Sequence, residues 1–245
     1  MTRHICSAYK FPLVLFCSVL TACGGGGGGG GSSSSTSVSI TELQPKGFVV
    51  PQTSRTVILT GTNLANGMTI TATDSNGNNY AGTATYNASL GNLSVPVTIS
   101  TAPTDRYLTV TLKSSTGTVL ATEALGVASV SKTLASDVFP IFNNNVCYSC
   151  HTSVSNIPDM SSSSLAASTL INTSSTKCSG KYRVKAGDPR RSSNVLLDVL
   201  YAKTTTPVMS CNSVTSTRAM PQGSGAALTQ TELDTITEWI AGGAN

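Results

Sequence analysis

The segment Cys147-Tyr148-Ser149-Cys150-His151 places two thiols and an imidazole at the spacing of a covalent haem attachment site. Thiols at this spacing can add across the two vinyl groups of a porphyrin, and the neighbouring imidazole can then ligate the iron. Two other uses of these side chains stay open. Cys147 and Cys150 could form a disulfide, or both thiolates and His151 could hold a structural zinc with a fourth ligand. The motif favours one covalent haem c, with His151 as the proximal ligand of the haem iron.

Few side chains in the mature chain could serve as the second axial ligand of the haem iron. The chain has two histidines, and His4 lies in an N-terminal leader, so two histidine ligands from one mature chain are excluded. The second ligand must be a methionine, another side chain, water or nothing. Methionines outside the leader are Met68, Met160, Met209 and Met220. We expect Met160 to pack in a core, as methionine usually does, and Met68 belongs to a β-rich segment. Met209 and Met220 remain, and Met220 is favoured because Pro221 fixes the backbone behind it.

The N-terminus predicts an exported and lipid-anchored protein. A basic start, Arg3 and Lys10 among it, precedes an apolar core of about ten residues, which is too short to span a bilayer and is typical of a signal peptide. The sequence Leu20-Thr21-Ala22-Cys23 resembles the lipobox of bacterial lipoproteins. The resemblance implies a signal peptide over 1–22 and lipidation at Cys23. Because no Asp follows Cys23, the same resemblance favours the outer membrane over the inner one.

Residues 23–37 continue as a run of glycines and then serines, which predicts a flexible tether. The chain carries a formal net charge of +4, and loss of Arg3 and Lys10 with the leader lowers it, which argues against nucleic acid as a partner. Seven cysteines include three in or next to the leader. The remaining four are the motif pair and Cys178 and Cys211, which we expect to form a disulfide in an oxidising compartment. A zinc site that combines both pairs is the alternative.

Residues 38–130 alternate short apolar runs with turn residues and predict an all-β domain. The expected strands contain Val57–Leu59, Met68–Ile70, Leu93–Val95, Val97–Ile99 and Tyr107–Val110. The run from Val57 to Leu64 resembles the opening of an IPT/TIG immunoglobulin-like domain, which implies a β-sandwich. We expect this segment to act as a spacer or docking module.

Residues 131–245 carry helical patterns instead. Leu134, Val138, Ile141 and Phe142 predict a first helix that ends or bends at Pro140, and 193–202 predicts a middle helix. Thr229 and Glu232 form a capping box, so a last helix should follow and stop at Gly242-Gly243.

The order of motifs in this segment resembles class I, monohaem, cytochromes c. The matching residues are Cys147-x-x-Cys150-His151, Gly187-Asp188-Pro189, Ser193–Leu196, Met220-Pro221, Leu228-Thr229, Glu232 and Trp239–Ala244. The resemblance implies thioethers at Cys147 and Cys150, His151 as proximal ligand and Met220 as distal ligand. It also implies a fold class in which an all-β immunoglobulin-like sandwich over 38–130 is followed by an all-α cytochrome c fold over 131–245.

These predictions lead to an electron carrier rather than an enzyme, acting alone or as a subunit of a larger oxidoreductase. It would carry single electrons between a redox protein donor and an acceptor in the bacterial cell envelope. A basic run could dock an acidic redox partner, hold the haem propionates or be a solvated loop; it comprises Lys177, Lys181, Arg183, Lys185, Arg190 and Arg191. Two other functions stay open: a haem enzyme or sensor with an open distal site, and an envelope binding protein with a redox accessory.

Overall fold

The computed structural model describes residues 37–152, 157–209, 211, 219–222 and 225–245. Residues 36–245 cluster as one compact unit. The predicted signal peptide, the predicted lipidation site Cys23 and the predicted tether up to residue 36 lie outside the described residues. Among the residues that are described, no helix has the length and apolar character needed to cross a membrane.

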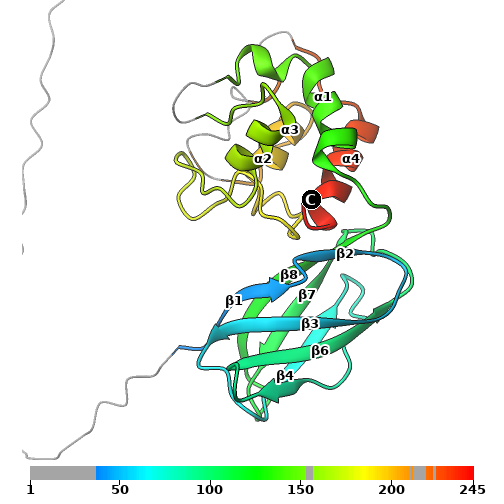
Figure 1. The fold of residues 1–245 in the computed structure, drawn as a ribbon, viewed down its shortest axis with the longest axis vertical. Coiled ribbons are helices and arrows are strands. Elements are labelled where there is room, and N and C mark those ends of the chain that lie inside the picture. The colour runs from blue at the N-terminus through cyan, green and yellow to red at the C-terminus, as the bar shows by residue number, and fades with distance from the viewer. Residues whose placement is uncertain (1–36, 153–156, 210, 212–218, 223–224) are drawn as a thin grey trace, which may run out of the picture. The chain divides into compact units, whose positions relative to one another are not determined.

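The first part of the unit consists of two four-stranded sheets (Figure 1). One sheet has the order β1-β3-β6-β5 and the other β2-β8-β7-β4. All paired strands run antiparallel except β2 and β8, which are parallel. The strands are β1 Ser39–Gln44, β2 Gly47–Val49, β3 Gln52–Thr62, β4 Thr69–Thr73, β5 Thr85–Asn87, β6 Asn92–Ile99, β7 Tyr107–Lys113 and β8 Val119–Ala128.

A shared apolar core holds the two sheets together. Along β7 every second residue is buried, and the same alternation runs along β6, as expected for strands that bury one face. Val57 and Leu93 from one sheet and Leu108 and Leu125 from the other belong to a single buried cluster. The apolar alternation in the sequence therefore correctly predicted β3, β4, β6 and β7.

The rest of the unit has short helices joined by long irregular segments. They are a π-helical turn η1 Leu134–Val138, α1 Phe139–Asn144, a 3₁₀ turn η2 Cys147–Ser149, α2 Ser163–Leu170, α3 Val195–Tyr201 and α4 Gln230–Ala241. The capping box at the start of α4 is present, with Thr229 and Glu232 each bonding the other's backbone. Trp239 and Ile240 of α4 are fully buried beside Phe142 of α1 in a second apolar cluster.

The predicted fold class, an all-β immunoglobulin-like sandwich followed by an all-α cytochrome c fold, is wrong. Among the described residues, 31% are strand and only 21% are helix. Between α2 and α4 the described backbone is mostly turns, with isolated bridges such as Ile171 to Val184 in place of helical hydrogen bonds. The helical patterns mark real helices, but these are too short to make an all-α domain. They complete one β-rich unit instead.

Three glycines allow the backbone of the strands to touch the backbone of the C-terminal segment. A methyl group added at Gly47 or at Gly126 would overlap the carbonyl oxygen of Ala241, at the end of α4. A methyl group at Gly187 would overlap the carbonyl oxygen of Lys46. The Gly187 N–H also donates to the Ile240 carbonyl at 2.8 Å. Since backbone atoms cannot rotate away as side chains can, any larger residue must separate the two segments.

Buried charges reinforce this junction. Glu238 of α4 is buried, accepts the Ser129 N–H at 2.6 Å and pairs with Arg106 at 2.8 Å. Asp188 is buried and accepts two hydrogen bonds of 2.7 Å from Arg190. Each carboxylate therefore has charged partners, which offsets the cost of removing it from water.

We expect Gly126→Ala to destabilise the whole unit by about 1–3 kcal/mol or more, because the new methyl group meets backbone that cannot yield. Gly242→Ala is the matched control, since there the nearest atom to the new methyl group, the Glu238 carbonyl oxygen, is 3.3 Å away. Denaturant unfolding of both variants measures the difference. Equal stability of the two would contradict the close backbone contact.

The pKa of Asp188 lies below its ordinary value of 3.8, because the Arg190 hydrogen bonds and the Arg190 and Lys185 charges outweigh burial, which by itself raises it. A depressed pKa stabilises the folded state above about pH 3.8, and this stabilisation is lost as the pH falls through the lower folded value. Asp188→Asn should cost about 1–3 kcal/mol at pH 7, where it leaves half-exposed Arg190 without its partner. The difference in free energy of unfolding between the wild type and Asp188→Asn should shrink as the pH is lowered from 7 to 3. A difference that stays constant would contradict this assignment.

Candidate functional site

The Cys-x-x-Cys-His segment is a tight turn at the end of α1. Val146 has the left-handed φ of 56°, which turns the chain out of α1 and into η2. The N–H groups of Cys150 and His151 then both point back to the Cys147 carbonyl, at 3.3 and 2.9 Å. These bonds hold the two thiols and the imidazole on a single turn of backbone.

The start of α4 anchors this turn. Asn145 donates from its side chain to the Ile141 carbonyl at 2.9 Å and to the Glu232 carboxylate at 3.0 Å. The same carboxylate accepts the Thr229 N–H at 2.8 Å in the capping box. Glu232 therefore ties the helix that precedes the motif to the last helix of the chain. The capping box could be predicted from the sequence, whereas its contact with Asn145 depends on tertiary structure.

The two cysteines of the motif are free thiols in different environments. Cys147 is half-buried and packs against the main apolar cluster of the C-terminal segment. Burial raises the pKa of its thiol to about 11. Cys150 is exposed. The structure therefore has no disulfide between Cys147 and Cys150, which was one of the alternatives.

The imidazole of His151 is held in one orientation by a carbonyl group. Nδ1 lies 3.2 Å from the Pro158 carbonyl oxygen. A carbonyl can only accept, so Nδ1 carries the proton and Nε2 keeps its lone pair. Burial lowers the pKa of His151, and the Arg183 charge lowers it further, against the opposing effect of the Pro158 bond. A neutral imidazole with one nitrogen bonded to a carbonyl is the usual state of a metal ligand.

Exposed apolar side chains occur within and close to the motif in the sequence. Val146, Tyr148 and Ile157 are 50%, 42% and 37% exposed. Val146 and Tyr148 flank Cys147 along the chain, and Ile157 precedes Pro158, whose carbonyl meets His151. These side chains offer apolar surface that a bound group could cover.

The candidate methionine ligands lie in different surroundings. Met220 is half-buried against the same apolar cluster as Cys147, and its N–H donates to the Val199 carbonyl at 2.9 Å. Met209 is buried in a small separate cluster with Cys178. Met160 is buried in the main cluster, as expected for a core residue. Its backbone N–H donates to the His151 carbonyl at 2.7 Å. Met160 and Met220 thus lie in or against the apolar cluster that Cys147 contacts, whereas Met209 lies in a different cluster.

A disulfide joins Cys178 and Cys211. A zinc site formed by all four cysteines is thereby excluded, because these two sulfurs are bonded to each other. Across the part of the chain that the structure describes, no three His, Cys, Asp or Glu side chains come together as a metal cluster. Direct coordination of one metal ion by Cys147, Cys150 and His151 is therefore not supported.

Other residues of the predicted cytochrome resemblance have structural roles. Gly187 makes the backbone contact with Lys46, and buried Asp188 binds Arg190. Asn194 is buried and donates from its side chain to the carbonyls of Asp188 and Arg190. Trp239 is enclosed in the core and donates to the Asn245 carbonyl at 3.0 Å. The order of these residues in the sequence thus reflects packing, and the assignment to class I cytochromes c is not supported.

Half of the basic run forms ion pairs within the molecule. Lys185 bonds Glu123 at 2.8 Å, and Arg191 bonds Asp198, which is fully buried, at 2.7 Å. With Arg190 on Asp188, three of the six cations stabilise the loop rather than form an open patch. Lys177 and Lys181 are exposed. The run as a whole is therefore a weaker docking surface for an acidic partner than its charge suggests.

Comparison with known proteins gives no relative: no protein-family model matches the chain, and no curated protein does.

In haem-free protein, we expect iodoacetamide to modify Cys150 much faster than Cys147. Cys150 is exposed, whereas burial keeps the Cys147 thiol protonated at neutral pH, and only the thiolate reacts. Peptide mass spectrometry after timed labelling at pH 8, with Cys150→Ser and Cys147→Ser as single-thiol controls, measures the two rates. Equal rates in the folded protein would contradict the burial of Cys147.

Proposed function

We propose that this chain is an electron carrier that holds one haem through thioether bonds from Cys147 and Cys150. His151 would ligate the iron on one side and Met220 on the other. The proposal does not require the all-α cytochrome c fold, which this chain lacks. It depends on one local arrangement, the turn that holds both thiols beside an oriented imidazole.

The single observation that carries the proposal is the hydrogen bond from His151 Nδ1 to the Pro158 carbonyl. It leaves Nε2 as the free nitrogen, which is the state that an axial ligand needs. The thiols need not converge with the imidazole on one point, because they bond to porphyrin carbon atoms and not to iron. The absence of a three-residue metal cluster among the described residues is therefore compatible with this chemistry.

Two further features support the proposal. The exposed apolar side chains Val146, Tyr148 and Ile157 would be shielded from water by a bound macrocycle, which offers a physical reason for their position. Met220 and Cys147 border the same apolar cluster, so a thioether ligand is available in the surroundings of the motif.

The haem would supply an iron that cycles between Fe(III) and Fe(II) and so moves one electron without transferring a group. The protein's residues would set how readily this happens. A thioether sulfur stabilises the ferrous state and would therefore raise the reduction potential. Because His151 and Met220 would both be bound to the iron, oxygen and peroxide would have no open site at which to react.

The proposed setting is the bacterial cell envelope, with lipid at Cys23 as the membrane anchor. The disulfide between Cys178 and Cys211 fits an oxidising compartment. A covalently attached haem suits such a location, because it cannot be lost to the surrounding medium. The donor and acceptor would be redox proteins in the same compartment.

Protein matured in a bacterial periplasm should carry one covalent haem, which remains attached after denaturation and acid extraction. Cys147→Ser combined with Cys150→Ser should carry none. Met220→Leu should keep the haem, lose the sulfur-to-iron charge-transfer band of the oxidised form and show a lower reduction potential. Absorption spectra of oxidised and reduced protein, a pyridine haemochrome and potentiometric titration measure these outcomes.

Met209→Leu is the matched control, since it makes the same substitution in the cluster beside Cys178 and should leave spectrum and potential unchanged. Loss of the band in Met209→Leu instead would move the ligand assignment to that residue. Ready binding of carbon monoxide by the wild type would favour a haem enzyme or sensor. Absence of covalent haem would end the proposal.

A further inference from the structure

A cleft runs between the first strands and the loop that precedes α3. It consists of two hollows with volumes of about 440 and 660 Å³ that share Lys46, Asn172 and Ala186 in their walls. The strands β1 and β8 contribute Glu42 and Glu123 to the larger hollow. Every residue that lines either hollow belongs to the described part of the chain. Each of the two volumes is within the range of protein sites for small organic ligands.

The walls of this cleft are held in place before any ligand binds. The Asn172 N–H donates to the Val184 carbonyl at 2.7 Å, and the Asn172 side chain accepts the Ala186 N–H at 3.1 Å. The contact of Gly187 with the Lys46 carbonyl fixes the loop against the strands. A ligand would therefore meet a preformed site, which lowers the entropy lost on binding.

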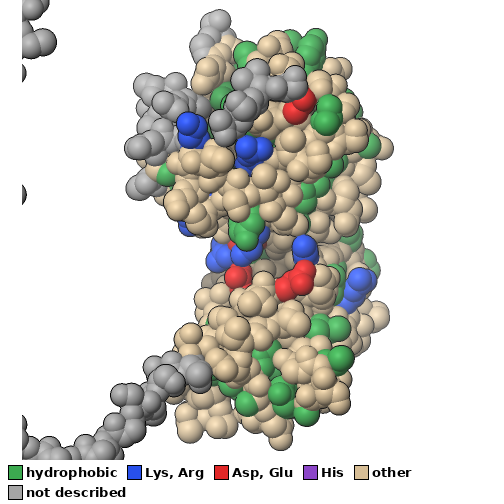
Figure 2. All heavy atoms as spheres, turned by 60° about the vertical axis from the view of Figure 1, so that its left-hand side comes forward, with side chains coloured by type: hydrophobic (Ala, Val, Ile, Leu, Met, Phe, Trp, Pro, Cys, Tyr) green, Lys and Arg blue, Asp and Glu red, His purple; other side chains and the backbone are tan. Residues whose placement is uncertain are grey.

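The charged side chains that line the larger hollow form two ion pairs of opposite charge. Lys185 bonds Glu123 at 2.8 Å, and Lys46 lies 3.7 Å from Glu42. Figure 2 shows Lys and Arg side chains next to Asp and Glu side chains along this junction. A strongly anionic or cationic ligand would have to break these pairs. An uncharged ligand rich in hydroxyl groups can instead hydrogen-bond to their outer atoms, because paired carboxylates and ammonium groups retain free acceptor and donor positions.

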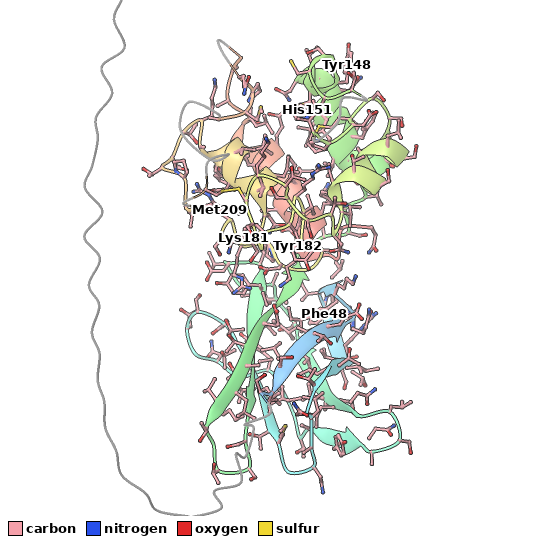
Figure 3. All side chains as sticks on the ribbon, turned by 90° about the vertical axis from the view of Figure 1, so that its left-hand side faces the viewer. Phe48, Tyr148, His151, Lys181, Tyr182 and Met209 are labelled. Carbon is pink, nitrogen blue, oxygen red and sulfur yellow. A yellow bond between two sulfur atoms is a disulfide. The ribbon has the colours of Figure 1, made fainter. Side chains whose placement is uncertain are left out.

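An aromatic ring completes the larger hollow. Tyr182 lines it and is 37% exposed. Its backbone is fixed by bridges to Ser174 and Asn194 and by a hydrogen bond from Val195 at 3.0 Å. In Figure 3 Tyr182 lies beside the strands, whereas Tyr148 and His151 lie at the far end of the same segment. An exposed ring on rigid backbone offers an apolar face and a polar hydroxyl together.

From these features we infer that the cleft binds a neutral oligosaccharide. A sugar ring has a face of C–H groups that can stack on Tyr182 and a rim of hydroxyl groups. Glu42, Glu123 and Lys185 supply acceptors and donors for that rim, and the exposed amide of Asn172 adds both. The site is separate from the haem motif, so the inference stands independently of the proposed electron transfer.

Affinity electrophoresis and calorimetry on the full chain test this inference, with cellopentaose and maltopentaose as neutral glucans and chitopentaose as a cell-wall type of amino sugar. At least one should bind, and the affinity should change little between low and high salt, since the ligand is uncharged. Tyr182→Ala should weaken binding about tenfold through loss of stacking, and Tyr182→Phe should keep most of it. Tyr148→Ala removes an equally exposed tyrosine elsewhere and should leave the affinity unchanged.

Glu42→Gln provides a second test on an exposed residue that the fold does not require, and it should weaken binding severalfold while the melting temperature stays unchanged. Saturable binding that depends on Tyr182 and Glu42 supports the inference, and the sugar that binds identifies the source. Binding only of a polyanion such as dextran sulfate, with loss at high salt, would overturn it. No binding of any neutral sugar, or binding that Tyr182→Ala does not change, would overturn it too.

Discussion

The backbone of the strands and the backbone of the C-terminal segment touch directly, and the rest of the structure depends on this contact. Gly47 and Gly126 meet Ala241, and Gly187 meets Lys46, at positions where a single methyl group would force the chains apart. A contact between backbone atoms leaves no room for side chains to adjust. The two segments therefore behave as one unit, and Glu238 and Asp188 can be buried there with their charged partners.

The C-terminal segment carries two candidate sites at its two ends. At the junction, the loop from Asn172 to Ala186 closes a charge-balanced cleft against the strands. At the other end, the Cys-x-x-Cys-His turn is anchored by Asn145 and Glu232 to the start of α4. Because α4 reaches from one region to the other, its packing in the core fixes both. A redox centre and a ligand cleft could thus be carried on one rigid body without sharing residues.

Interactions between residues close in the sequence set the geometry of the Cys-x-x-Cys-His turn. The left-handed Val146 and the two hydrogen bonds to the Cys147 carbonyl form a turn that needs only a few neighbouring residues. Such a turn can be built on folds of more than one kind, since it requires no particular arrangement of long helices. A Cys-x-x-Cys-His turn can therefore occur in a β-rich unit whose fold is not that of an all-α cytochrome, and the motif alone did not predict the fold.

The sequence by itself determined what depends on neighbours along the chain. Alternation predicted β3, β4, β6 and β7, and the capping box predicted the start of α4. Residue spacing singled out the two thiols and His151 as a candidate site. The sequence did not predict β2, whose parallel partner β8 is distant in the chain, nor the hydrogen bond from His151 to Pro158. The helical patterns were correct locally but wrong as evidence for an all-α domain, because periodicity does not say what a helix packs against. Only the tertiary structure showed that Gly187 joins the segment to the strands, since the Lys46 backbone that it meets is distant in the chain.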